Sequence, residues 1–244
     1  MIEIIRDYWQ VLLIGQYPQG PLGGVLLTLI LAIAGLVLSF PISVVLAILR
    51  ISPFAVLRIP ATVVVYTVRS VPLIMLVFWT YFLVPLLVGK SVSGVTTLLC
   101  TLVVYQAAYL SEVIRAGIQA LPDGQMEGAR ALGLSYVQTV RKVLLPQAIY
   151  NMVPSIISQF VSTIKDTSLG YVISVQELTF AANHVNSQLL TKPFEVFMIL
   201  ALTYFAICFC LTELAHSFEK RVAKKRLGTQ PTLSGTTNDT ILES

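Results

Sequence analysis

Charged residues along this chain are gathered into short clusters, and long uncharged runs separate the clusters. The runs are Tyr8–Leu49, Ser70–Gly89, Ser91–Ser111, Val143–Ile164 and Val196–Thr212. A helix that crosses a bilayer needs about 20 largely apolar residues. The pattern therefore predicts an all-α integral membrane protein with five transmembrane helices, over residues 23–49, 57–88, 92–114, 143–164 and 195–216.

The first uncharged run is too long for one crossing helix, and its early part, Tyr8–Pro21, is rich in glutamine, proline and aromatic residues. We expect a helix and a turn there that lie at the membrane interface, so that residues 1–21 form a segment of their own. Pro41, Pro72 and Pro154 interrupt three of the predicted spans. Lipid tolerates such interruptions only where neighbouring groups satisfy the freed backbone atoms.

Composition and charge fix the environment and the orientation. Of the 244 residues, 56% are hydrophobic and 11% are charged, whereas soluble domains carry about 25% charged residues. Lys and Arg concentrate in cytoplasmic connections. With the N-terminus outside, only Arg6, Lys90, Lys165 and Lys192 fall on the outer side. This predicts a cytoplasmic C-terminus, a five-helix domain over residues 22–222, and a basic and disordered cytoplasmic tail over 223–244.

Several kinds of site are not expected. Glu3 and Asp7 spoil the basic flank that a cleavable signal needs. The three cysteines lie inside predicted spans without metal-ligand spacing to either histidine; they are Cys100, Cys208 and Cys210. The Gly-x-x-x-x-Gly-Lys-Ser/Thr loop that cradles phosphates is absent. We therefore expect no metal, no cofactor, no nucleic-acid partner and no ATPase site in this chain, so that energy must come from a partner.

The one sizeable loop on the inner side, residues 116–142, has strong signals of order. Asp123 follows a proline and can cap a helix that starts near Gly124. Gly133 suits the left-handed position that ends a helix, and Ser135 with Gln138 forms the pattern of a capping box. We expect two short helices with a sharp break. The first is thin and amphipathic, so it could dock in a groove of another protein or lie on the membrane surface.

The sequence Glu127-Gly128-Ala129, followed by Gly133 and Leu145-Pro146, resembles the EAA loop of the permeases of ATP-binding-cassette (ABC) importers. That family has Ala where this chain has Gly128, which lowers helix propensity by about 1 kcal/mol but is smaller still. The resemblance covers residues 22–222 and is to the polar amino acid branch. Its matching positions are Tyr109, Glu112, Arg115, Gly117, Ile118, Pro122, Gly124-Gln125, Leu132-Gly133, Leu145-Pro146-Gln147-Ala148, Pro154 and Lys165-Asp166-Thr167-Ser168-Leu169.

Within that branch, the strings Arg69-Ser70-Val71-Pro72-Leu73 and Gln106–Glu112 look most like glutamate/aspartate permeases, although many relatives have Gly-Thr in place of Ser70-Val71. The resemblance implies the type I ABC importer permease fold in a bacterial inner membrane. It also implies a second permease subunit, a paralogue that gives a heterodimer, two ATPase subunits that bind ATP and Mg, and an external solute-binding protein. The implied ATPase-coupling residues are Gly124, Gln125, Glu127, Gly128, Ala129, Arg130, Leu132 and Gly133.

Arg69 is the main candidate for substrate contact from the residues themselves. It lies eleven residues beyond Arg58, about 16 Å deeper at the helical rise. An ionisable residue at that depth is a functional candidate, and Pro72 frees backbone groups close by. Arg69 could therefore bind a carboxylate, or it could pair with a carbonyl or acidic group inside the protein.

The second candidate region closes the fourth predicted span, at Lys165–Ser168. Its charges and hydroxyls could line an opening, or they could form a solvated helix end. Glu112 and Arg115 share a helix face, and we expect a structural ion pair there. The complete set of predicted pathway residues is Arg69, Ser70, Pro72, Tyr109, Lys165, Asp166, Thr167 and Ser168.

A self-contained secondary transporter or channel is the alternative. Carriers of that kind usually double a unit within one chain, and these five predicted spans show no internal repeat. Apart from Arg69, the spans also lack the buried acid or histidine relay that proton coupling needs. An intramembrane enzyme is disfavoured because no span contains a Ser–His or His–Glu–x–x–His arrangement.

Overall fold

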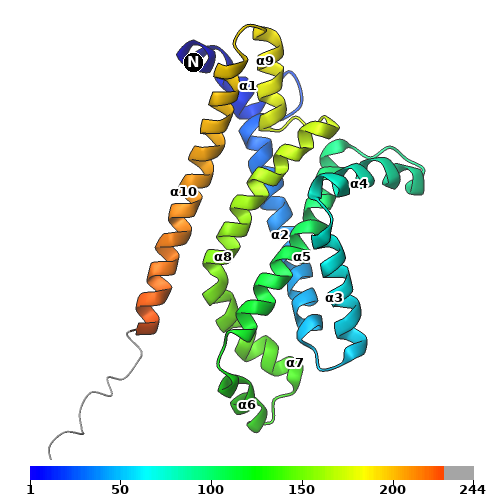
Figure 1. Cartoon of the computed structure of the whole chain (residues 1–244), viewed down its shortest axis with the longest axis vertical. Coiled ribbons are helices and arrows are strands. Elements are labelled where there is room, and N and C mark those ends of the chain that lie inside the picture. Colours follow the sequence, from blue (N-terminus) through cyan, green and yellow to red (C-terminus); the bar gives the residue numbers. More distant parts are fainter. Residues whose placement is uncertain (228–244) are drawn as a thin grey trace, which may run out of the picture.

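The computed structural model describes residues 1–227, and the regular structure in this part is helical apart from two isolated β-bridges. The helices run from an N-terminal helix through two central helices to a long last helix (Figure 1). Their bounds are α1 Ile2–Ile14, α2 Gly24–Ile51, α3 Ala55–Ser70, α4 Leu73–Val88, α5 Gly94–Gln119, α6 Asp123–Ala131, α7 Tyr136–Thr139, π-helix η1 Val140–Leu144, α8 Leu145–Asp166, 3₁₀-helix η2 Thr167–Ile173, α9 Leu178–Leu189 and α10 Pro193–Leu227.

Within residues 1–227, three helices are long and apolar enough to cross a membrane: α2, α5 and α10. The pair α2 and α5 forms the centre of the molecule, where α2 buries a stripe of small residues that includes Ala32, Gly35 and Ser39. Two apolar helices gain little from leaving lipid for each other, so close packing of small residues drives their association. Leu31 and Leu102 fill the rest of this contact and are almost fully buried.

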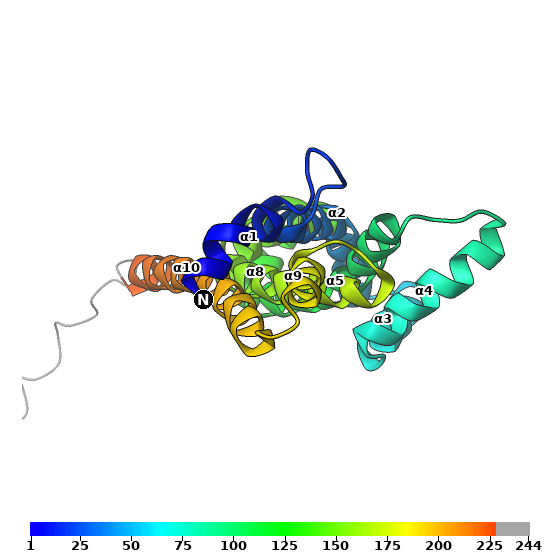
Figure 2. The same cartoon turned by 90° about the horizontal axis from the view of Figure 1, so that it is seen from above.

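The predicted single span over 57–88 is wrong in its shape. The structure divides it into α3 and α4, which are bent by 101° at the break. Pro72 lacks an N–H and clashes with the preceding turn, and it forces Val71 into extended geometry (φ −99°, ψ 132°). The start of α4 then packs on the core through Leu73 and Val77. Figure 2 shows α4 extending away from the rest of the bundle, whereas α3 contacts α2 and α5.

The fourth predicted span corresponds to α8, which does not reach the hydropathy of α2, α5 and α10. One reason is that α8 contacts α2, α5 and α10 and directs polar groups such as Gln159 into the bundle. A π-turn precedes α8, where the N–H of Leu145 bonds to the carbonyl of Val140. The next residue, Pro146, has no N–H to continue the α-helical ladder.

The two ends of the molecule differ in what they present (Figure 1). At one end lie the N-terminus, α1 and α9, with Ile4 and Leu12 of α1 packed against Leu178 and Val185 of α9. At the other end lie α6, α7 and the last turns of α10. The turn after α1 runs into α2 at Gly24. The tail predicted to be disordered beyond residue 227 lies outside the described residues.

Candidate functional site

A row of polar side chains follows one face of α5. Tyr105, Gln106, Tyr109 and Glu112 have the spacing of neighbours on a helix. The hydroxyl of Tyr105 donates to that of Tyr109 at 3.1 Å, and the two rings lie 4.7 Å apart between centroids. Polar groups aligned in this way inside a membrane protein are usually part of a pathway or a network. The row brings together groups from α3 and α8.

At one end of the row, three arginines meet one carboxylate. We call Glu112, Arg50, Arg69 and Arg115 the Glu112 cluster. Arg50 Nη1 donates to Glu112 Oε2 at 2.5 Å, and Arg115 donates to both carboxylate oxygens. The ion pair predicted between Glu112 and Arg115 is confirmed. Because three guanidinium groups surround one carboxylate, positive charge is in excess.

Arg69 is held more loosely than the other two arginines. Its Nη1 lies 3.8 Å from Glu112 Oε2, which is an ion pair without a hydrogen bond. The guanidinium also lies 5.0 Å from the ring centroid of Tyr109, a cation–π distance. Its Nε is buried without a partner, yet the side chain remains 32% exposed. Both interpretations of the sequence are therefore compatible with the structure, since Arg69 pairs with an acidic group and its guanidinium makes no hydrogen bond to it.

At the other end of the row, Gln106 links α5 to α8. Its Nε2 donates to Asp166 Oδ2 at 3.1 Å, and its Oε1 accepts from Gln159 Nε2 at 2.5 Å. Gln106 is fully buried, so this amide fixes the half-buried Asp166 at a defined place beside the row. The structure therefore brings together three of the predicted pathway residues: Arg69, Tyr109 and Asp166.

The other predicted pathway residues do not join the row. Ser70 and Pro72 lie exposed at the break between α3 and α4. Lys165 is exposed at the end of α8. The hydroxyls of Thr167 and Ser168 donate to backbone carbonyls three residues earlier, at 2.7 Å and 2.6 Å, so both are engaged locally.

Sequence reasoning missed four members of this network: Arg50, Tyr105, Gln106 and Gln159. The spacing along α5 could have identified two of them. Tyr105 and Gln106 precede Tyr109 by four and three residues, which places all three on one helix face. No local signal could have placed Arg50, which is 62 residues from Glu112.

The loop between α5 and α8 forms the two short helices that the sequence predicts. Gly133 has φ +81°, its N–H bonds to the carbonyl of Arg130, and the N–H of Leu134 bonds to that of Ala129. This is the Schellman arrangement, so the predicted left-handed glycine is confirmed. The capping box of Ser135 and Gln138 is also confirmed.

One detail of the loop prediction is wrong. Asp123 is the first residue of α6 and makes no capping hydrogen bond, because Pro122 occupies the N-cap position. Its carboxylate still lies in the first helical turn, where the helix dipole favours a negative charge.

Most of the predicted coupling residues are exposed in this chain. Ala129 is buried, whereas Gln125, Glu127 and Arg130 are exposed and Leu132 is 85% exposed. An added Cβ at Gly124 or Gly128 would meet nothing within 4 Å. No contact within the described residues therefore requires these two glycines to be small.

The loop is fastened to the bundle at three points. The hydroxyl of Tyr136 in α7 donates to the carbonyl of Ile51 at the end of α2, at 2.8 Å. Gln147 in α8 donates to Gln125 in α6 at 3.2 Å. Met126 packs against the apolar core that α2, α5 and α8 share at this end. These contacts make α6 and α7 an ordered projection.

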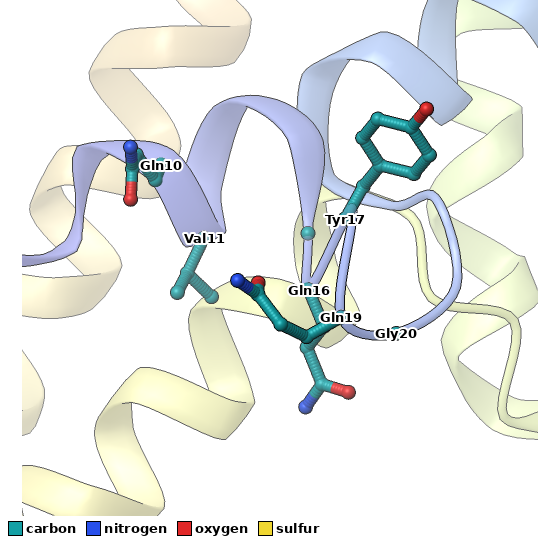
Figure 3. Close-up of a pocket in the computed structure, with 7 residues that line it drawn as sticks. Gln10, Val11, Gln16, Tyr17, Gln19 and Gly20 are labelled. Carbon is teal, nitrogen blue, oxygen red and sulfur yellow. The ribbon is translucent and has the colours of Figure 1, made fainter.

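A separate hollow of about 330 Å³ lies near the N-terminus (Figure 3). It is lined by α1 and the turn that follows, through Gln10, Val11, Gly15, Gln16, Tyr17, Gln19 and Gly20. All of these residues are uncharged, and none belongs to the α5 row. The hollow therefore lacks a group that would hold a carboxylate or an ammonium by charge.

A buried acid outside the spans fixes the start of α9. Glu177 is 0% exposed and caps the helix by accepting hydrogen bonds from the N–H groups of Thr179 and Phe180. It also accepts from the hydroxyl of Tyr204 at 3.1 Å. Burial raises the pKa of Glu177 to about 7, although these hydrogen bonds favour its charged form. This carboxyl ties α9 to α10.

Metal binding finds no support in the part of the chain that is described: residues 1–227 contain no group of three His, Cys, Asp or Glu side chains that could hold an ion. The cysteines at 100, 208 and 210 are free thiols.

Comparison with known proteins gives consistent results. A family described as "Binding-protein-dependent transport system inner membrane component" matches residues 39–224. The "Probable glutamine ABC transporter permease protein GlnP" of Bacillus subtilis is 38% identical over 85% of this chain and 98% of its own length. The "Glutamate/aspartate import permease protein GltK" of Escherichia coli is 32% identical, over 83% of this chain and 93% of its own.

A solved structure is similar over most of the chain. The "Crystal structure of an amino acid ABC transporter with histidines" has a TM-score of 0.73 and 29% identity, and the match covers 81% of this chain and 92% of that one.

Proposed function

Since the chain belongs to the family of inner membrane components of binding-protein-dependent transport systems, we propose that it forms half of the translocation pathway of a polar amino acid importer. It is a multi-pass membrane protein and a permease subunit of an ABC amino acid importer. The proposal adds a second permease, a paralogue that gives a heterodimer, two ATPase subunits that bind ATP and Mg, and an external solute-binding protein in a bacterial inner membrane.

The α5 row is the observation that supports a pathway in this chain. It presents a loosely paired cation, Arg69, and an acid, Asp166, along one helix face. A dicarboxylic amino acid has a side-chain carboxylate that could bind Arg69 and an ammonium that could bind Asp166. The row also supplies the neutral donors and acceptors Tyr109 and Gln106, which would fix the orientation of a polar substrate.

L-glutamate or L-aspartate is the substrate that we propose within this class. The excess positive charge of the Glu112 cluster favours a substrate with a second carboxylate. A relative named as a glutamate/aspartate permease agrees with this choice. Another relative is named for glutamine, an amino acid that differs from glutamate only by a neutral amide in place of the side-chain carboxylate. Selectivity in the external binding protein would add to that of the row.

Coupling to the ATPase would occur through α6 and the turn that ends it. The helix is short, thin and exposed, and it carries Glu127, Arg130 and the protruding Leu132. We propose that it seats in a groove of an ATPase subunit, together with Gly124, Gln125, Gly128, Ala129 and Gly133. Movement of the ATPases would then reach the pathway through the contacts of α6 and α7 with the bundle.

The test is the energy source of uptake. Right-side-out proteoliposomes that contain both permeases and the ATPases should take up glutamate only with internal ATP and the external binding protein. Uptake by this chain alone, driven by a proton or sodium gradient, would instead support the self-contained carrier. A gradient without ATP is the matched control in the same vesicles.

A further inference from the structure

Glu112 joins three helices through one carboxylate. Its partners are Arg50 at the end of α2, Arg69 at the end of α3 and Arg115 on α5 itself. Arg50 is the most buried of them, with a side chain only 3% exposed, and its guanidinium lies 5.6 Å from the ring centroid of Tyr66. Removing the carboxylate would leave the buried Arg50 without its ion-pair partner, so this residue determines how the three helix segments meet.

The three arms of the cluster are unequal. Arg50 and Arg115 donate hydrogen bonds to Glu112, whereas Arg69 lies at 3.8 Å and donates none. The Nε atoms of Arg69 and Arg50 are both buried without a partner, so the difference lies in the missing hydrogen bond to Glu112 and in exposure, which is 32% for the Arg69 side chain and 3% for that of Arg50. An incoming carboxylate could therefore take Arg69 while Glu112 keeps its hydrogen bonds to the other two arginines. The incoming carboxylate would offset part of the excess positive charge, because the cluster holds three guanidinium groups and one carboxylate.

The stronger arms lead toward the exposed loop. Arg50 is followed by Ile51, whose carbonyl accepts the hydrogen bond from Tyr136 of α7. On α5, Ile114 directly precedes Arg115 and Ile118 follows it by three residues, and both belong to the apolar cluster that contains Val140 of the π-turn. A shift at the cluster would thus act on the same ends of α2 and α5 that hold α7 and η1.

From these contacts we infer that Glu112 is a positioning residue: it holds Arg69 ready for a substrate carboxylate and ties α3 to α2 and α5 until that carboxylate replaces it. The inference rests on the proposed function. It assigns to Glu112 the restraint that keeps the empty transporter from hydrolysing ATP, because release of Arg69 is the event that substrate brings about.

The test compares Glu112→Gln with Glu3→Gln in the complete complex, in bilayers of one lipid composition. Gln has the shape of Glu without its charge, so the restraint is lost. We expect ATP hydrolysis without substrate to rise about fivefold or more, in the range of typical coupling energies, while glutamate uptake per ATP falls. Glu3→Gln removes an exposed carboxylate on α1, 3.7 Å from Lys192, and should change neither quantity.

Damage to the fold alone would lower hydrolysis and uptake together, and that result would overturn the inference, as would an unchanged ratio of uptake to hydrolysis. If the Gln variant fails to assemble, Glu112→Asp keeps the charge but shortens its reach, so the arm to Arg69 weakens first. An Asp complex with the wild-type ratio would also overturn it. Absence of ATP-dependent uptake by the unmodified complex would reject the proposed function itself, whatever the variants do.

Discussion

At the scale of single residues, Arg69 combines contacts inside the protein with exposure that the proposed substrate role requires. Its contacts to Glu112 and Tyr109 offset the cost of a cation at the end of α3. These contacts leave part of the guanidinium available, since it makes no hydrogen bond to Glu112 and a third of the side chain is exposed.

The first prediction concerns Arg69→Ala. A hydrogen bond to a charged group contributes about 1.5–3 kcal/mol, so we expect glutamate uptake to fall about 10- to 100-fold. Glutamine uptake should fall much less, because its side chain carries no second carboxylate. Uptake of both labelled amino acids by the same proteoliposomes, with each binding protein saturated, measures the difference. Equal losses for the two substrates would reduce Arg69 to a structural residue.

The second prediction concerns the buried acid Glu177. Its pKa is raised from 4.5 to about 7 in the fold, so the fold favours the protonated form. The stabilisation by the bound proton is complete below about pH 4.5 and is lost as the pH rises to about 7, on the order of 3 kcal/mol. Thermal unfolding midpoints of the purified protein should therefore fall from pH 5 to pH 8.

Glu177→Gln is the matched variant for that prediction, because it keeps the cap oxygen and removes the titration. The fall of the midpoint between pH 5 and pH 8 should shrink in the variant. The same fall in both proteins would show that other groups cause it. Tyr204 contacts Glu177 directly, and Tyr204→Phe, which removes one donor, should raise the Glu177 pKa further.

At the scale of the elements, the sequence predicted those helices whose ends depend on local chemistry. Gly133 and the Ser135–Gln138 pair determine the break in the loop through contacts within a few residues. The 101° bend between α3 and α4 is different. Pro72 signals an interruption, but the angle depends on Leu73 and Val77 packing against distant helices, which no local pattern encodes.

The third prediction tests the turn that ends α6. Gly133 has positive φ, where a residue with a Cβ is strained by about 1–2 kcal/mol and a β-branched one by more. Gly133→Val should disturb the turn and the exposed Leu132 beside it, so ATP-driven uptake should fall strongly. The thermal midpoint should fall only by this backbone strain, because a Cβ at Gly133 meets nothing within 4 Å of this chain.

Gly128→Ala is the control in the same helix. It raises helix propensity by about 1 kcal/mol and its Cβ also meets nothing within 4 Å, so uptake should persist. Loss of uptake in Gly128→Ala with normal stability would mean that the proposed ATPase groove contacts the helix more closely than alanine allows. Normal uptake in Gly133→Val would contradict a role of this turn in coupling.

At the scale of the whole molecule, the candidate site could be predicted only in part. The run that contains Tyr109 and Glu112 is visible in the sequence because its members share one helix face. The cluster as a whole is not visible, since Arg50 and Arg69 reach Glu112 from helices far away in sequence. Long-range ion pairs of this kind depend on how α2, α3 and α5 pack, and packing of small residues leaves no charge pattern to read.

The last prediction concerns how the molecule sits across the membrane. The loop with α6 and the helix α9 lie at opposite ends (Figure 1), and the distribution of Lys and Arg predicts that α6 faces the cytoplasm. We expect a cysteine at Glu127 to react with a membrane-impermeant maleimide only from the inside, and one at Gln188 only from the outside. Both positions are exposed, so access to reagent is set by the bilayer.

Serine should first replace the three native cysteines, because Cys100 and Cys210 are exposed as well. Labelling of both positions from one side would contradict a multi-pass arrangement with α6 and α9 on opposite faces, and labelling of each from the unexpected side would reverse the orientation that the charges predict.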